Sequence, residues 1–170
     1  MIGFYCEGRG LKFLLVAGMV LCAGCNRSLS PARAGEVERD VRAFAGAVAH
    51  DVTHDGPAAW QRLFEESPAF FMASEGRLVF PDRASARTAI DELVRTVKQI
   101  ELKWGDDLRV DPLTEDLAIL GASYHEIRLG IAGDRVDESG FFTGTVEHHG
   151  GRWQFRNAHW SVVTPPPAVR

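Results

Sequence analysis

The chain has 170 residues, of which 45% are hydrophobic and 25% charged, and its formal net charge is −4. This length fits one globular domain, and the composition excludes wholesale disorder and a basic tail for nucleic-acid binding. All three cysteines, Cys6, Cys22 and Cys25, lie at the start of the chain. The remaining sequence therefore contains no disulfide, cysteine-ligated metal site or cysteine nucleophile.

The first segment has the pattern of a secretion signal. Residues 13–24 are an unbroken apolar or small run, shorter than the roughly 20 residues that a membrane-spanning helix needs. Arg9 and Lys12 precede this run, and small residues follow it. The small pair before Cys25 resembles the bacterial lipoprotein box, which implies that Cys25 is lipidated and becomes the new N-terminus. A plain secreted protein and a buried N-terminal helix are the alternatives.

These features predict four consecutive segments. Residues 1–24 are a lipoprotein signal peptide, and residues 25–35, which are small and polar, are a flexible tether. Residues 36–163 form the folded domain, and residues 164–170 are a proline-rich tail that cannot join a sheet. We expect the mature protein to be lipid-anchored in a bacterial cell envelope, facing the periplasm or the exterior. Its contact with the membrane is through the lipid only.

Helical periodicity dominates the first half of the domain. Apolar residues recur at helical spacing over residues 36–54, and Gly56-Pro57 ends that helix and opens a short second one. A third helix follows Pro81-Asp82, where Asp82 or Ser85 can cap it.

Strand patterns dominate the second half. Residues 69–73 and 77–80 are predicted to form a hairpin, and longer strands are expected at residues 98–104, 117–129, 136–148 and 152–163. Short turns between consecutive strands indicate an antiparallel meander. Helices first and a meander last predict an α+β fold with the helices on one face of the sheet.

This order of elements resembles the nuclear transport factor 2-like superfamily, and within it the SnoaL-like group. The local matches are residues 55–60 (DGPAAW) through Phe70-Phe71, and residues 140–143 (GFFT) through Trp153 to residues 158–161 (AHWS). The resemblance implies a cone-shaped, strongly curved antiparallel sheet wrapped around a long helix. It also implies an apolar pocket at the open end of the cone and a homodimer through the convex face. The superfamily includes isomerases, cyclases, dehydratases, binding proteins and assembly domains, so the fold leaves the activity open.

Alternation assigns the two faces of the last predicted strand. Trp153, Phe155, Asn157, His159 and Ser161 share one face, which begins apolar and ends polar as expected for a core that opens into a pocket. Trp160 lies on the opposite face, where we expect a partner surface. A β-bulge would exchange the two assignments beyond it.

His159 is the strongest candidate for chemistry. At the polar end of an apolar face, an imidazole can act as a general base or bind a ligand, or it can be a buried histidine with a purely structural role.

Tyr124 and Glu126 form the second candidate pair, because alternation places them on one face and His125 on the other. We expect Tyr124 and Glu126 to face inward, where an apolar cone would raise the pKa of the carboxyl group. In the alternative, Glu126 and Arg128 lie on the solvated face.

Aromatic residues supply further pocket candidates. Trp60, Phe71 and Trp104 can line a ligand pocket, although aromatic residues at such places are more often ordinary core. His50 and His54 have the i, i+4 spacing of metal ligands, but no third ligand is evident, so neither a metal nor a cofactor is expected.

The sequence favours a lipid-anchored accessory module that binds a small apolar or amphipathic molecule. The first alternative is a cofactor-independent isomerase, cyclase or dehydratase that uses His159 and Glu126 for general acid–base chemistry. The second is a dimeric assembly domain whose pocket is vestigial.

Overall fold

A computed structural model describes residues 29–163 of the chain. The predicted signal peptide, the lipidation site Cys25, the first part of the tether and the tail at 164–170 lie outside these residues. Within residues 29–163, no helix is both long enough and apolar enough to cross a membrane.

The first helix is longer than its apolar pattern predicts. Helix α1 spans Pro31–Asp55, so the end of the predicted tether is helical. The Ser30 side chain accepts a hydrogen bond from the backbone N–H of Arg33, and Pro31 occupies the first turn, where its missing N–H costs nothing. The buried face of α1 consists of Val37, Val41, Ala45, Val48 and Val52.

The other helices begin close to where the sequence predicts. A 3-10 turn, η1 (Gly56–Ala59), leads into the short α2 (Trp60–Leu63). Helix α3 spans Arg83–Thr96 and begins with a capping box, in which Asp82 and Ser85 each bond the other's backbone N–H.

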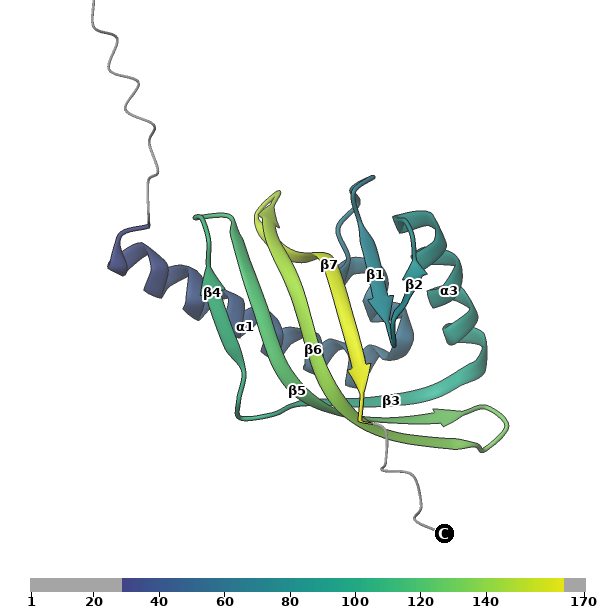
Figure 1. Ribbon diagram of the computed structural model, residues 1–170. Helices are drawn as coiled ribbons and strands as arrows, with labels where there is room; N and C mark the ends of the chain where they lie inside the picture. The colour runs from purple at the N-terminus through teal and green to yellow at the C-terminus, as the bar shows by residue number, and fades with distance from the viewer. Residues whose placement is uncertain (1–28, 164–170) are drawn as a thin grey trace, which may run out of the picture.

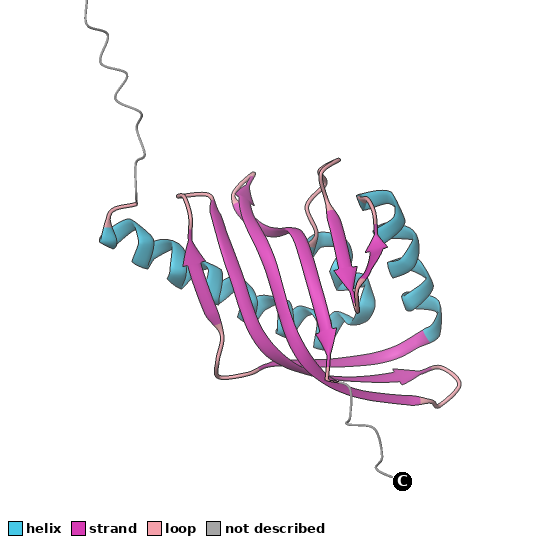
Figure 2. Ribbon diagram, viewed as in Figure 1, coloured by secondary structure: helices cyan, strands magenta, loops and turns pink. Residues whose placement is uncertain are grey.

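A single seven-stranded sheet forms the other layer (Figure 2). Its strands are β1 (Phe71–Ser74), β2 (Arg77–Phe80), β3 (Val97–Trp104), β4 (Arg109–Pro112), β5 (Leu117–Gly130), β6 (Arg135–His149) and β7 (Arg152–Val162). Their order is β2-β1-β7-β6-β5-β3, and β4 also pairs with β5. Two features differ from the predicted meander, since β1 and β7 run parallel and β4 forms where a turn was expected.

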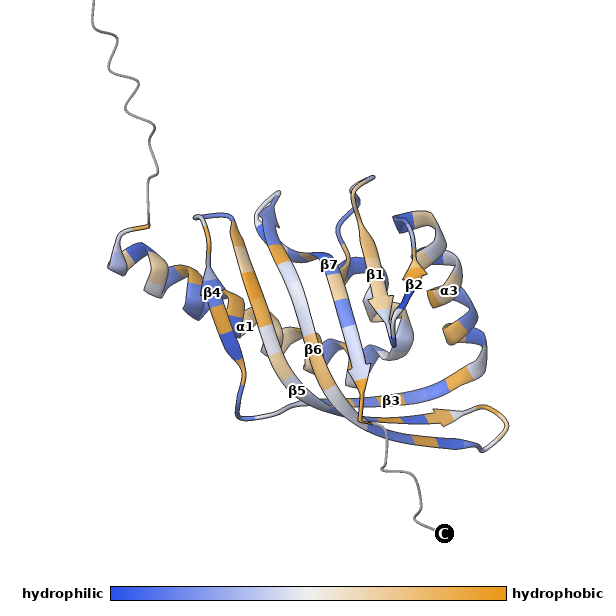
Figure 3. Cartoon of the chain, viewed as in Figure 1, coloured by the Kyte–Doolittle hydropathy of each residue, from blue (hydrophilic) through white to orange (hydrophobic). Residues whose placement is uncertain are grey.

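The long strands β5 and β6 bend, and α1 crosses one face of the sheet while α3 stands beside β2 (Figure 1). Hydrophobic and hydrophilic positions alternate along the long strands (Figure 3). The buried cluster joins α1 to the inner sheet face, where the Phe155 ring contacts Phe44 and Phe142, each at 5.1 Å between centroids. The α+β class and the long helix against a curved sheet are as predicted.

A β-bulge in β7 reverses the predicted faces of that strand. Thr145 pairs with Asn157 but Val146 pairs with Phe155, so Arg156 is an extra residue in β7. Beyond it, Ala158 and Trp160 face inward, and His159 is exposed on the outer face. The predicted inward placement of His159 and outward placement of Trp160 are therefore both wrong.

Candidate functional site

A cavity of about 160 Å³ lies between the inner sheet face and helices α2 and α3. Its walls are mainly aromatic and aliphatic: Trp60, Phe64, Met72, Phe80, Ile90, Leu93, Ile100, Tyr124, Trp160 and Val162. The other lining residues are Ser74 on β1, Glu126 and Arg128 on β5, and Glu138 on β6, so an apolar chamber carries a small polar group on one side.

Glu126 is the buried acid of this chamber, with 7% of its surface exposed. Nε of Arg128 lies 3.2 Å from its Oε1, and the same guanidinium donates a hydrogen bond of 2.8 Å to Glu138. Burial raises the pKa of Glu126 to about 7, because the carboxylate loses its water; Arg128 opposes this rise and Glu138 adds to it. Near neutral pH, Glu126 can therefore both give and accept a proton.

Tyr124 is the second polar group of the chamber. It is 3% exposed, and its hydroxyl has no hydrogen-bond partner among the described residues. Burial, assisted by the Glu138 and Glu126 carboxylates, raises the pKa of Tyr124 to about 12, so the phenol stays protonated. A Cβ on Gly140 would lie 2.8 Å from the Tyr124 ring, so the glycine opposite Tyr124 makes room for it.

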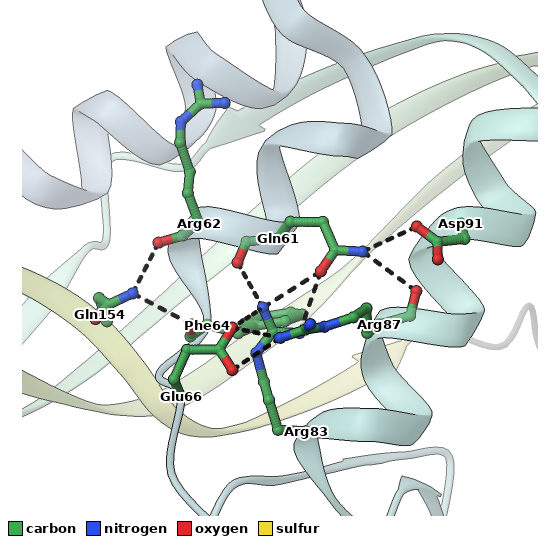
Figure 4. Close-up of polar contacts among 8 residues, drawn as sticks. All are labelled: Gln61, Arg62, Phe64, Glu66, Arg83, Arg87, Asp91 and Gln154. Atoms are coloured by element: carbon green, nitrogen blue, oxygen red, sulfur yellow. Dashed lines mark hydrogen bonds and ion pairs between the residues drawn. The ribbon is translucent and has the colours of Figure 1, made fainter.

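A polar clasp joins the two helices that cover the cavity (Figure 4). Arg83 at the start of α3 is 7% exposed, and its guanidinium donates a 2.5 Å hydrogen bond to the backbone carbonyl of Gln61 in α2. Glu66 contacts both Arg83 and Arg87 at 2.9 Å. On the other side of α2, Gln154 donates to the Arg62 and Phe64 carbonyls. These bonds hold the Trp60 and Phe64 wall against the sheet.

The structure places three of the sequence candidates, Trp60, Tyr124 and Glu126, in this cavity. Tyr124 and Glu126 face inward as alternation predicts. His125 faces outward, where its Nε2 lies 2.8 Å from Asp137.

The other candidates do not line the cavity. His159 and Phe71 are exposed, Phe71 at 44%, because parallel pairing with β7 puts the neighbouring Met72 inward. The remaining three side chains contact backbone instead: Trp104 donates to the Ala45 carbonyl, Ser161 donates to the Phe141 carbonyl, and Asn157 accepts from the Thr145 N–H.

Arg128 and Glu138 are functional candidates that sequence reasoning did not include in the pocket. Arg128 follows Glu126 by two residues on the same strand face, and Glu138 is directly opposite Glu126 in the β5–β6 register. Pairing the two predicted strands about their turn at residues 130–134 would have found both.

Among residues 29–163, no group of three or more histidine, cysteine or acidic side chains could hold a metal ion. The His50 and His54 rings stack 4.1 Å apart, and His54 Nδ1 bonds the His50 carbonyl, which is an ordinary helix-end contact.

Comparison with known proteins identifies the fold. No protein-family model matches the sequence, and no curated protein is similar to it in sequence. Solved structures do match. A nuclear transport factor 2-like superfamily protein from Salmonella enterica has 12% identity and a TM-score of 0.60, over 81% of this chain and 95% of that one.

Two further structures carry enzyme names. A candidate scytalone dehydratase from Novosphingobium aromaticivorans has 14% identity and a TM-score of 0.61, over 78% of this chain and 88% of that one. A type 2 hexachlorocyclohexane dehydrochlorinase, LinA, has 10% identity and a TM-score of 0.59, over 82% of this chain and all of that one. At these identities the likeness concerns the fold, and this chain has the fold of the nuclear transport factor 2-like superfamily.

Proposed function

We propose that this protein is a lipid-anchored module of the bacterial cell envelope that binds a small, mostly apolar molecule in the cavity beneath α2 and α3. The observation that carries the proposal is a chamber of aromatic and aliphatic side chains around one buried carboxyl group, Glu126. Ligand sites combine mainly apolar walls with a few polar groups that orient the ligand, and this chamber has that composition. Cys25 would carry the anchor.

The size of the cavity limits the ligand. A protein cavity of about 150 Å³ accommodates a molecule such as benzene. The volume of 160 Å³ therefore suits a body of about one six-membered ring, with its polar substituent directed at Glu126 and Tyr124.

A pair of variants tests whether the cavity is the site. Leu93 lines the cavity and its neighbour Val94 is exposed, so Leu93→Phe fills the chamber and Val94→Phe is the matched control. A library of one-ring compounds is screened by protein NMR. We expect bound compounds to shift cavity resonances, and Leu93→Phe but not Val94→Phe to weaken binding at least tenfold. Equal binding by both variants, or no hit in the library, would contradict the proposal.

A second candidate function is cofactor-independent acid–base catalysis, favoured by the raised pKa of Glu126 at about 7. The Glu126 carboxylate would take a proton from a carbon next to a carbonyl, and the Tyr124 hydroxyl would donate a hydrogen bond to the resulting enolate oxygen. The exposed position of His159 excludes it as the partner acid or base of Glu126. The dehydratase and dehydrochlorinase names of two structural neighbours support this candidate by analogy of fold alone.

Hydrogen–deuterium exchange tests catalysis directly. One-ring ketones are incubated in D₂O with wild-type protein and with Glu126→Gln, and loss of the α-proton signal is followed by NMR. Catalysed exchange that disappears in Glu126→Gln is the expected result. Exchange no faster than in buffer across the ketone set would count against catalysis and leave the binding proposal standing.

A further inference from the structure

The polar group of the cavity carries an excess of negative charge. Two of its carboxylates, Glu126 and Glu138, share a single guanidinium, that of Arg128. A third carboxylate, Glu75, lies nearby in the β1–β2 turn, where it accepts a hydrogen bond from the Val162 N–H. With all these groups ionised, the one arginine leaves negative charge unbalanced beside an apolar chamber.

One buried polar atom in this region has no partner. The Tyr124 hydroxyl makes no hydrogen bond within residues 29–163, and its oxygen can accept one. Beside it on the same strand face, Arg128 approaches Oε1 of Glu126. An unpaired buried polar group costs free energy, so a ligand that donates a hydrogen bond to Tyr124 would gain by satisfying it.

The surrounding walls suit a cation. Trp160 meets Trp60 and Tyr124 nearly at right angles, at 86° and 87°, with centroids 6.0 and 4.7 Å apart. Phe80 adds a further ring to the lining. Aromatic faces attract ammonium groups through the negative charge of their π electrons, and this attraction is stronger away from water.

We propose that the cavity selects a small protonated amine, with an apolar body of about one ring and an ammonium group that contacts Glu126 and Tyr124. This inference rests on the proposed function and names its ligand class. A carboxylate ligand would meet the excess negative charge, because Arg128 is already shared by two glutamates. A neutral alcohol would leave that charge unbalanced.

The selection should depend on pH. The charged groups that act on Glu126 are Arg128 on its own strand and Glu138 on β6. Glu75, in the exposed β1–β2 turn, acts on Tyr124, whereas α2 and α3 contribute only apolar side chains to the lining. An ammonium group binds the ionised carboxylate, so protonation of Glu126 below about pH 7 competes with the amine. Affinity for an amine should then fall up to tenfold for each pH unit below 7, whereas affinity for an alcohol should change little.

The test compares three ligands of similar size by calorimetry at pH 8: benzylamine, benzyl alcohol and benzoate. We expect benzylamine to bind at least tenfold more tightly than the other two. Glu126→Gln should reduce benzylamine affinity to that for the alcohol, and Tyr124→Phe should weaken it severalfold. The control is Glu101→Gln, whose carboxylate pairs with Lys103 away from the cavity and whose replacement should change nothing.

The outcomes separate this inference from the proposed function. If benzyl alcohol or benzoate binds as tightly as benzylamine, selection for an amine is wrong and the binding site stands. If none of the three binds and the one-ring library also gives no hit, both proposals fail. The wild-type ligand comparison and its pH series decide the matter even if Glu126→Gln does not fold.

Discussion

Trp160 meets Tyr124 edge to face inside the cavity, with ring centroids 4.7 Å apart and ring planes at 87°. The contact exists because Arg156 is an extra residue in β7 and turns every later side chain to the other face. Without the bulge, Trp160 would be on the outer face and His159 would take its place against Tyr124.

The bulge predicts unequal losses of stability on replacing two neighbouring residues. Trp160→Ala should lower the free energy of unfolding by about 3 kcal/mol, because a large ring that packs on the core leaves a void. His159→Ala should change it by less than about 0.5 kcal/mol, because this side chain is exposed. Urea denaturation measures both, and a larger loss for His159→Ala would refute the assigned faces.

Glu126 should make stability depend on pH in a definite direction. Its pKa is about 7 in the folded protein against 4.5 as the unperturbed value, so the folded state holds the proton more tightly. Ionising the buried carboxyl group therefore lowers the free energy of unfolding. This loss is absent below pH 4.5, grows as the pH rises towards 7 and is complete above it. It amounts to about 3 kcal/mol.

The variant Glu126→Gln removes this titration. Its stability relative to wild type should therefore rise by up to about 3 kcal/mol between pH 4.5 and pH 8, measured by urea denaturation at each pH. Glu101→Gln should show no such rise. A difference between Glu126→Gln and wild type that stays constant with pH would mean that the carboxyl group is not buried as described.

The clasp between α2 and α3 predicts unequal roles for its two arginines. Arg83 is buried on the Gln61 carbonyl, whereas Arg87 is exposed (Figure 4). Arg83→Ala should cost about 2–4 kcal/mol of stability, because it leaves buried acceptors unpaired. Arg87→Ala should cost less than about 1 kcal/mol, as exposed ion pairs do. Equal losses in thermal or urea unfolding would argue against the buried clasp.

Lipidation at Cys25 stays a prediction, since this residue lies outside those described. Wild-type protein expressed in a bacterium should incorporate labelled palmitate and sediment with membranes. Cys25→Ser should remain unprocessed or be released in soluble form, and Cys22→Ser is the matched control. Absence of label in the wild-type protein would overturn the anchor.

A homodimer through the outer sheet face also stays a prediction, but Trp160, which was expected on that surface, faces inward. Phe141, which is 43% exposed and contacts the Gly121 position, replaces it as the residue to test. If the dimer exists, Phe141→Glu should give a folded monomer in sedimentation experiments, because an aromatic residue at an interface centre contributes about 2 kcal/mol or more. A wild-type protein that is monomeric at high concentration would exclude the dimer.

The sequence by itself predicted the helices and strands that are determined by residues close together in the chain. The periodicities of α1 and α3, a cap at Asp82 or Ser85 and the long strands all follow from residue spacing and short-range hydrogen bonds. For Tyr124 and Glu126 the sequence predicted a shared face but left open which face is inward, although it favoured the inward alternative. The structure places both side chains inward, on a part of β5 that alternates regularly.

Only the tertiary structure decided the features that depend on distant partners. The bulge at Arg156 is a mismatch between β6 and β7, and β1 joins β7 in parallel across more than eighty residues of chain, so neither is encoded in the pattern of one strand. The raised pKa of Glu126 also depends on distant partners. Burial by α2, α3 and β7 raises its pKa, and pairing with β6 brings Glu138 and its share of Arg128 into the site. Solvent exclusion and cross-strand pairing are properties of the packed chain, and they convert an ordinary glutamate in a strand into the candidate centre of a binding site.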